Sequence, residues 1–188
     1  MDSKTQKLIK PMPELVGAEF LSEDKLINLT NLTEFLQANS LKLRWCSKDR
    51  WEIAILKSYQ YQYYNQILRR LVLHEDDKNW SVVLHCFSDY DKYIIDDEFK
   101  NFMHDNIYRY RCDVNYGLVS GDDHRNCGAI SNMNILGKTF ERMCCNSQIR
   151  IVNPTDKALE YTKQLVLIAK KIVESGVAEL KRKSPGRF

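Results

Sequence analysis

The sequence predicts an α+β fold, in which an antiparallel sheet of about five strands carries helices packed on one face. Two observations support this prediction: apolar residues recur with helical spacing in two long segments, and apolar and polar residues alternate in several shorter ones. A third observation is that short polar turns separate successive strand segments. Such turns favour antiparallel pairing of neighbouring strands over parallel crossovers.

Three helices are predicted. The first is expected over residues 23–38, where Ser22 is a suitable N-cap and two acidic residues occupy the first turn. A short helix is expected over 96–107, which also begins with acidic residues. The last is expected over 154–175, with Asn153 as N-cap and proline at the first helical position. Its apolar stripe consists of Ala158, Tyr161, Leu165, Ile168, Ala169, Ile172 and Val173.

The strand segments begin with a predicted hairpin, 41–45 and 51–55, joined by a polar turn. Alternation within this hairpin places Trp45 and Trp51 on the same face. Residues 80–87 carry apolar side chains on both alternating faces, which predicts a central strand covered on both sides. Further strands are expected at 134–140 and 148–152, the segment 59–64 alternates as well, and 67–74 stays open between helix and strand.

The composition indicates one globular domain over residues 1–188. Hydrophobic residues make up 44% and charged residues 28% of the chain, which is ordinary for a globular protein. Residues 1–20 contain two closely spaced prolines and are interpreted as an extended arm, and the basic segment 181–188 as a disordered tail. No apolar run is long enough for a membrane helix, and the polar N-terminus lacks signal-peptide character, so a cytoplasmic protein is expected.

The chain contains a set of short motifs from residue 41 onward: Lys42-x-Arg-Trp45, Arg50-Trp51, the aromatic strand from Trp80, Glu98-Phe-Lys-x-Phe102, Leu136-Gly-Lys-x-Phe140 and Ile149-x-Ile-x-Asn-Pro154. In these motifs it resembles a family of uncharacterised small bacterial cytosolic proteins, a domain of unknown function. In that family the loop before the Gly-Lys-x-Phe element carries a tighter cluster of cysteine and glycine, to which Cys112, Cys127 and Cys144 correspond here. In layout alone, the order of strands and helices is also similar to frataxin-like iron-chaperone domains.

Aromatic residues provide the first candidate site. Tyrosine and tryptophan combine an apolar body with a polar tip, which suits a pocket for a small ligand or a surface for a protein partner. Aromatic residues also dominate ordinary sheet cores, so a purely structural role is the alternative. The predicted ligand-binding residues are Trp45, Trp51, Tyr59, Tyr61 and Trp80.

Cysteines provide the second candidate site. A cytosolic location makes structural disulfides exceptional, so the six cysteines are core residues, metal ligands or reactive thiols. His124 and Cys127 have the spacing of a ligand pair for zinc or another thiophilic metal, and the loop from Cys112 to Cys145 supplies further thiols. The predicted metal ligands are Cys112, His124, Cys127 and Cys144.

The sequence contains no recognisable motif of an enzyme active site. The sequence contains no Gly-rich phosphate loop, no serine nucleophile elbow and no HExxH zinc motif. The net charge of +3 is mild and argues against a nucleic-acid partner. The sequence therefore favours a non-catalytic binding domain, with a metal-binding protein as the alternative.

Overall fold

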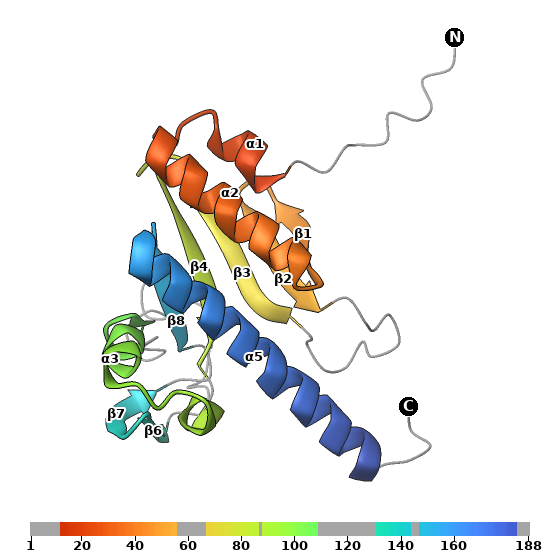
Figure 1. The fold of residues 1–188 in the computed structure, drawn as a ribbon, viewed down its shortest axis with the longest axis vertical. Coiled ribbons are helices and arrows are strands. Elements are labelled where there is room, and N and C mark those ends of the chain that lie inside the picture. The colour runs from red at the N-terminus through yellow and green to blue at the C-terminus, as the bar shows by residue number, and fades with distance from the viewer. Residues whose placement is uncertain (1–11, 56–66, 87, 109–130, 144–146, 184–188) are drawn as a thin grey trace, which may run out of the picture.

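The computed structural model describes residues 12–55, 67–86, 88–108, 131–143 and 147–183 (Figure 1). The predicted segment 59–64 and most of the cysteine loop lie outside these residues. The α+β class is confirmed, and the antiparallel sheet has six strands in the order β1-β2-β3-β4-β8-β5. The strands are β1 (Leu41–Ser47), β2 (Arg50–Ile55), β3 (Ile67–His74), β4 (Asn79–His85), β5 (Ile107–Tyr108) and β8 (Gln148–Val152).

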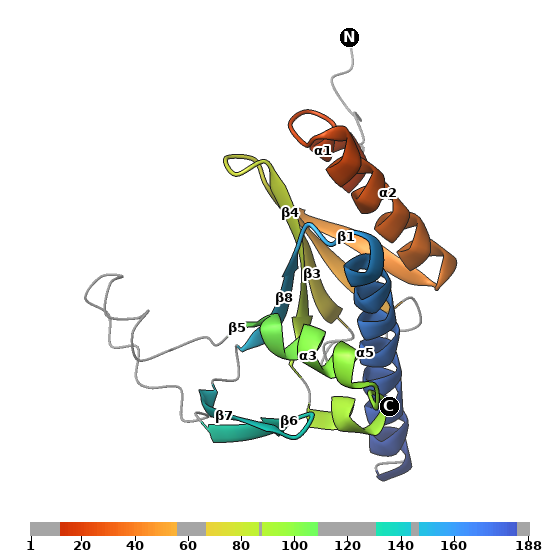
Figure 2. The ribbon, with the colours of Figure 1, turned by 60° about the vertical axis from the view of Figure 1, so that its left-hand side comes forward.

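Helices lie on one side of this sheet. They are α1 (Pro13–Gly17), α2 (Glu23–Ala38), α3 (Asp97–Asp105) and α5 (Asp156–Lys183), with a short 3-10 helix, η1 (Ser88–Lys92), after β4. Figure 2 shows α2 and α5 on the same face of the sheet. On the opposite face, no helix within the described residues packs against the strands. The predicted packing of helices on one face is therefore confirmed.

The meander β1–β4 follows from alternation in the sequence. Leu41, Leu43 and Trp45 of β1 lie opposite Ile55, Ile53 and Trp51 of β2, so these six side chains share the helix-covered face. The same face continues through Leu71 and Leu73 of β3, Val82 and Leu84 of β4, and Ile149 and Ile151 of β8. Leu29, Leu32 and Leu36 of α2, with Leu165, Val166 and Ala169 of α5, complete the buried core.

Asn153 joins β8 to the core of the sheet. Its backbone N–H donates to Trp80 O, and its side-chain Oδ1 accepts from Trp80 N–H at 2.9 Å. Asn153 has φ 42°, a left-handed conformation that asparagine tolerates better than most residues. The prediction of Asn153 as the helix N-cap was wrong, because its side chain bonds to β4 and α5 begins at Asp156.

The predicted single strand at 134–140 was also wrong. Two strands, β6 (Ser131–Ile135) and β7 (Lys138–Met143), form a separate hairpin. Leu136 and Gly137 connect them, and both have positive φ, 53° and 80°, as a two-residue type I′ turn requires. The backbone N–H of Leu136 donates to Asp91 Oδ1 at 2.6 Å, which attaches the hairpin to η1.

Other boundaries differ in smaller ways. The helix over 23–38 is confirmed as α2, and the expected helix 96–107 is the shorter α3, with Asp96 as its N-cap. The extended-arm prediction was wrong for Pro13–Gly17, which form α1, whereas residues 1–11 lie outside the described residues. The last helix continues past Gly176 to Lys183, into the predicted disordered tail.

Candidate functional site

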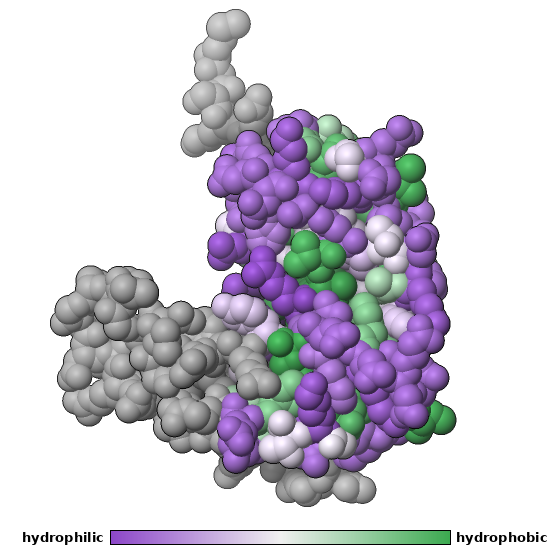
Figure 3. Space-filling model, turned by 90° about the vertical axis from the view of Figure 1, so that its left-hand side faces the viewer, coloured by the Kyte–Doolittle hydropathy of each residue, from purple (hydrophilic) through white to green (hydrophobic). Residues whose placement is uncertain are grey.

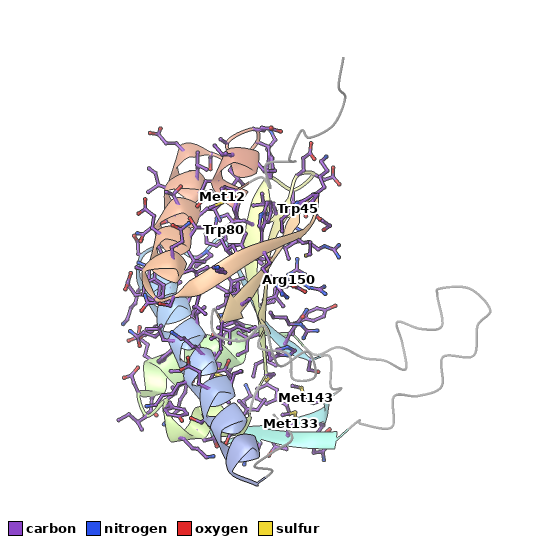
Figure 4. The ribbon with its side chains drawn as sticks, turned by 90° about the vertical axis from the view of Figure 1, so that its right-hand side faces the viewer. Met12, Trp45, Trp80, Met133, Met143 and Arg150 are labelled. Carbon is purple, nitrogen blue, oxygen red and sulfur yellow. The ribbon has the colours of Figure 1, made fainter. Side chains whose placement is uncertain are left out.

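The predicted aromatic site lies largely inside the core. Trp51 is 1% exposed and Trp80 is fully buried, and Trp45 is half-buried against the same cluster. Figure 4 shows Trp80 between the sheet and the helices. The alternative interpretation, that these tryptophans form the core, fits their burial. Tyr59 and Tyr61 lie outside the described residues, so their predicted role is untested.

The predicted metal ligands Cys112, His124, Cys127 and Cys144 all lie outside the described residues as well. Within the part of the chain that is described, no group of three or more His, Cys, Asp or Glu side chains is arranged to hold a metal ion. Two described cysteines have free thiols, Cys46 exposed and Cys86 half-buried. Burial raises the pKa of Cys86 to about 12, so this thiol stays protonated and is a poor nucleophile at neutral pH.

The opposite face of the sheet carries a feature that the sequence analysis missed. Cross-strand pairing places Arg44 opposite Glu52, Glu52 opposite Arg70, Arg70 opposite Val83, and Val83 opposite Arg150. Directly opposed residues share a face, so these five side chains form one row across β1, β2, β3, β4 and β8. We call this set the arginine row. Figure 4 shows Arg150 on the side of the sheet away from α2 and α5.

Among the residues that the structure describes, the arginine row contains one salt bridge, at its β1 end. Arg44 forms a salt bridge with Glu52 at 2.6 Å. Neither Arg70 nor Arg150 forms a salt bridge within the described residues, and between them stands Val83, which is 7% exposed. Arg70 is exposed and Arg150 is half-buried. Arg70 and Arg150 therefore stand on either side of a neutral position in the row, and the guanidinium group of Arg150 extends along the sheet toward His74.

Beside the row, His74 and Ser81 interact with Arg150. His74 Nε2 lies 3.0 Å from Ser81 Oγ and 3.4 Å from a guanidinium nitrogen of Arg150. A guanidinium group can only donate, so Nε2 is the acceptor and the ring proton resides on Nδ1. Burial, and then the charge of Arg150, lower the pKa of His74, which keeps the ring neutral at pH 7.

This histidine and serine resemble a nucleophile with its base, but their surroundings oppose that chemistry. Ser81 is fully buried, so a substrate carbonyl cannot approach its Oγ. Proton transfer from Ser81 would create an imidazolium directly beside Arg150, and the two positive charges would repel each other. The arrangement therefore holds Arg150 in place rather than activating Ser81.

A second histidine has a similar electrostatic environment. His85 of β4 lies on the same face, and its pKa is lowered by burial first and then by the charges of Arg69 and Arg70. Both histidines are thus held neutral beside arginines. Among the described residues of this face, Arg70 and Arg150 have no acidic partner in a salt bridge, and a surface with such positive charge attracts anions.

Figure 3 shows the side of the molecule that faces left in Figure 1, where hydrophilic residues predominate and hydrophobic residues form small separate patches. No helix among the described residues is both long and apolar enough to cross a membrane. No protein-family model, curated protein or solved structure matches this chain.

Proposed function

We propose that this protein is a non-catalytic cytoplasmic binding domain whose partner carries negative charge and binds at the arginine row. The observation that supports this proposal most directly is the pair Arg70 and Arg150 in one row of the sheet, neither of which forms a salt bridge within the described residues. A rigid sheet holds these two side chains in a fixed relation, so little conformational entropy opposes binding beyond that of the side chains themselves.

The proposed site lies on the face opposite to the tryptophans. Binding on the tryptophan face would require α2 and α5 to separate from the sheet, because Trp51 and Trp80 are core residues. Exposing a core of this kind costs about as much as unfolding a large part of the domain. Binding at the arginine row does not require any of the described helices to separate from the sheet.

The test is a binding titration followed by backbone amide NMR. Three probes are used separately: inorganic phosphate, an acidic peptide and an oligodeoxythymidylate. We expect at least one of them to shift the amide signals of β3, β4 and β8, with an affinity that falls as salt is added. The double variant Arg70→Glu/Arg150→Glu should lose this response. If no probe shifts these strands in the wild-type protein, the proposal is wrong.

The alternative proposal is a protein that binds zinc or another thiophilic metal through the loop from Cys112 to Cys145. Its support is the spacing of His124 and Cys127 and the number of thiols nearby. These residues lie outside the described ones. The described strands β5, β6 and β7 show which parts of the sequence such an ion would connect.

A further inference from the structure

The outer edge of β1 is an open edge of the six-stranded sheet. The strand order begins at β1 and ends at β5, which has two residues only. Figure 1 shows β1 at the right-hand limit of the sheet. Among the described residues, no strand pairs with this edge of β1, and no backbone hydrogen bond joins it to another segment. Alternate residues of such a strand direct their N–H and C=O groups outward, where they can bind a further strand.

The side chains of β1 give this edge one apolar side and one basic side. The apolar side chains point to the helix-covered face and are Leu41, Leu43 and Trp45. Leu43 and Trp45 are half-buried, so each retains some exposed apolar surface. Lys42 and Arg44 lie on the opposite face and are exposed, and Lys42 has no salt bridge within the described residues. A strand added here meets apolar side chains on one face and positive charge on the other.

We propose that this edge binds an extended polypeptide segment of alternating acidic and apolar residues, which joins the sheet as a further strand. Its acidic side chains lie beside Lys42 and its apolar side chains beside Leu43 and Trp45, while backbone hydrogen bonds to β1 hold it in place. The register of β1 shifts between Trp45 and Ser47, and bulges of this kind interrupt edge pairing, so the segment covers residues 41–45. This inference goes beyond the proposed function, because it concerns a different surface of the sheet.

A second copy of this chain does not fit the same edge. Directly opposed residues of an antiparallel pair share a face, so two β1 strands would gather Lys42 and Arg44 of both copies on one face, where these like charges repel. Basic side chains on an edge strand commonly prevent self-pairing in this way. The chain's own residues 1–11 are basic as well, with three lysines and one aspartate. An acidic segment converts the same charges of β1 into attraction.

The first test removes backbone hydrogen bonds and leaves every charge in place. The probes are fluorescein-labelled peptides of alternating glutamate and valine: one unmodified, one N-methylated at every glutamate and one N-methylated at every valine. Alternate N–H groups of a strand point to opposite edges, so only one methylated peptide keeps the N–H groups that face β1. We expect the affinities of the two methylated peptides for the wild-type protein, measured by fluorescence anisotropy, to differ by about tenfold or more. Equal affinities would show attraction by charge alone and would overturn the inference.

Hydrogen exchange of the backbone amides locates the bound peptide on the sheet. Exchange is followed by NMR on the wild-type protein, with and without saturating unmodified peptide. We expect alternate amides of residues 41–45 to exchange at least about tenfold more slowly in the complex, because the outward N–H groups then donate to the peptide. Unchanged exchange in β1 while the peptide is bound contradicts the inference.

Charge at the edge is tested with Lys42→Glu, which replaces an exposed cation by an anion. We expect K42E to bind the unmodified peptide at least about fivefold more weakly than the wild-type protein does, because attraction becomes repulsion. Lys138→Glu makes the same change at an exposed position of β7, outside the six-stranded sheet, and is the matched control. Its affinity should stay within about twofold of the wild-type value. Equal losses in the two variants would identify net charge as the cause and exclude the edge.

The location of the response separates this inference from the proposed function. Slower exchange in β1, with unchanged amide signals in β3, β4 and β8 for every probe, supports the edge alone. Shifted signals in β3, β4 and β8 with none of the expected protection in β1 support the arginine row alone. Responses at both surfaces support both proposals, and a wild-type protein that responds at neither surface sinks both.

Discussion

At the scale of single residues, His74 connects three strands through its ring. It belongs to β3, its Nε2 contacts Ser81 of β4, and Arg150 of β8 approaches the same nitrogen. Burial and Arg150 lower its pKa below the ordinary 6.5. Other charged groups nearby act in both directions, with Asp77 and Asp49 raising the pKa and Arg50 lowering it further. Folding therefore favours the neutral ring.

This environment predicts a pH dependence of stability. Because the pKa is lower in the folded state, the unfolded chain binds more protons once the pH falls below about 6.5. The stability that the neutral ring contributes is therefore present above that pH and is lost as the pH falls through the folded-state pKa. His74→Gln keeps an acceptor for Ser81 but cannot be protonated.

We expect the melting temperature of the wild-type protein to fall more steeply than that of His74→Gln between about pH 7.5 and pH 5. Thermal unfolding followed by circular dichroism at a series of pH values measures both slopes. His85→Gln provides a second comparison, because the pKa of His85 is lowered by burial and by two arginines. Parallel slopes for all three proteins would contradict the assignment.

Single residues also show what the sequence could reveal about the site. Arg70 precedes the buried Leu71, and Arg150 stands between the buried Ile149 and Ile151, so alternation alone places both arginines on the face away from the core. Alternation does not show that they stand in one row. That depends on pairings between residues as distant in sequence as Val83 and Arg150, and these pairings are set by the register of the folded sheet.

At the scale of elements, the junction of β8 and α5 depends on Asn153. Its Oδ1 accepts from the backbone N–H of Trp80 at 2.9 Å, and its Nδ2 donates to Asn79 Oδ1 at 2.6 Å. Lys25 of α2 donates to the same Asn79 oxygen. One side chain therefore links the start of β4 to the end of β8 and, through Asn79, to α2.

Asn153→Ala should destabilise the protein by about 2–4 kcal/mol. The loss combines a buried backbone donor left without its acceptor, about 1–3 kcal/mol, with the cost of a left-handed alanine, about 1 kcal/mol. Asn153→Asp keeps an acceptor for Trp80 N–H and tolerates φ 42°, so it should retain much of the stability. Chemical denaturation of both variants measures the difference. Equal destabilisation by the two substitutions would show that the bond to Trp80 is unimportant.

Elements also differ in how well the sequence predicts them. Strands β1, β2 and β8 have clear alternation, β4 carries apolar side chains on both faces, and all four were expected close to their observed positions. The β6–β7 hairpin was missed because its turn begins with Leu136, an apolar residue at a positive-φ position where Asn or Asp is the usual signal. Helix α1 was missed because five residues are too few to show helical periodicity.

At the scale of the whole molecule, the sheet divides the protein into two unlike faces. One is covered by α2 and α5 and holds the tryptophans in the core, and the other carries the arginine row. Because the buried core supplies most of the stability, exposed polar residues on the other face can change with little cost to folding. Arg70 is such an exposed position, so its substitution should separate binding from stability.

The cysteine prediction also concerns the whole molecule. In the sequence, Cys112, His124 and Cys127 fall between β5 and β6, and Cys144 directly follows β7. An ion bound by all four would connect the chain before the β6–β7 hairpin to the chain after it. It would close a long loop, and in doing so it would stabilise the folded state by restricting the unfolded one.

We therefore predict that the purified protein contains about one zinc or other thiophilic metal ion per chain, and that a chelator lowers its melting temperature. Elemental analysis measures the metal, and thiol titration with and without chelator counts the protected cysteines among the six. Cys127→Ser should lose the metal. Cys46→Ser should keep it, because Cys46 is an exposed free thiol on β1, outside the predicted ligand set. Absence of metal, with all six thiols titrating freely after mild opening of the fold, would exclude the metal site and leave the arginine row as the candidate for binding.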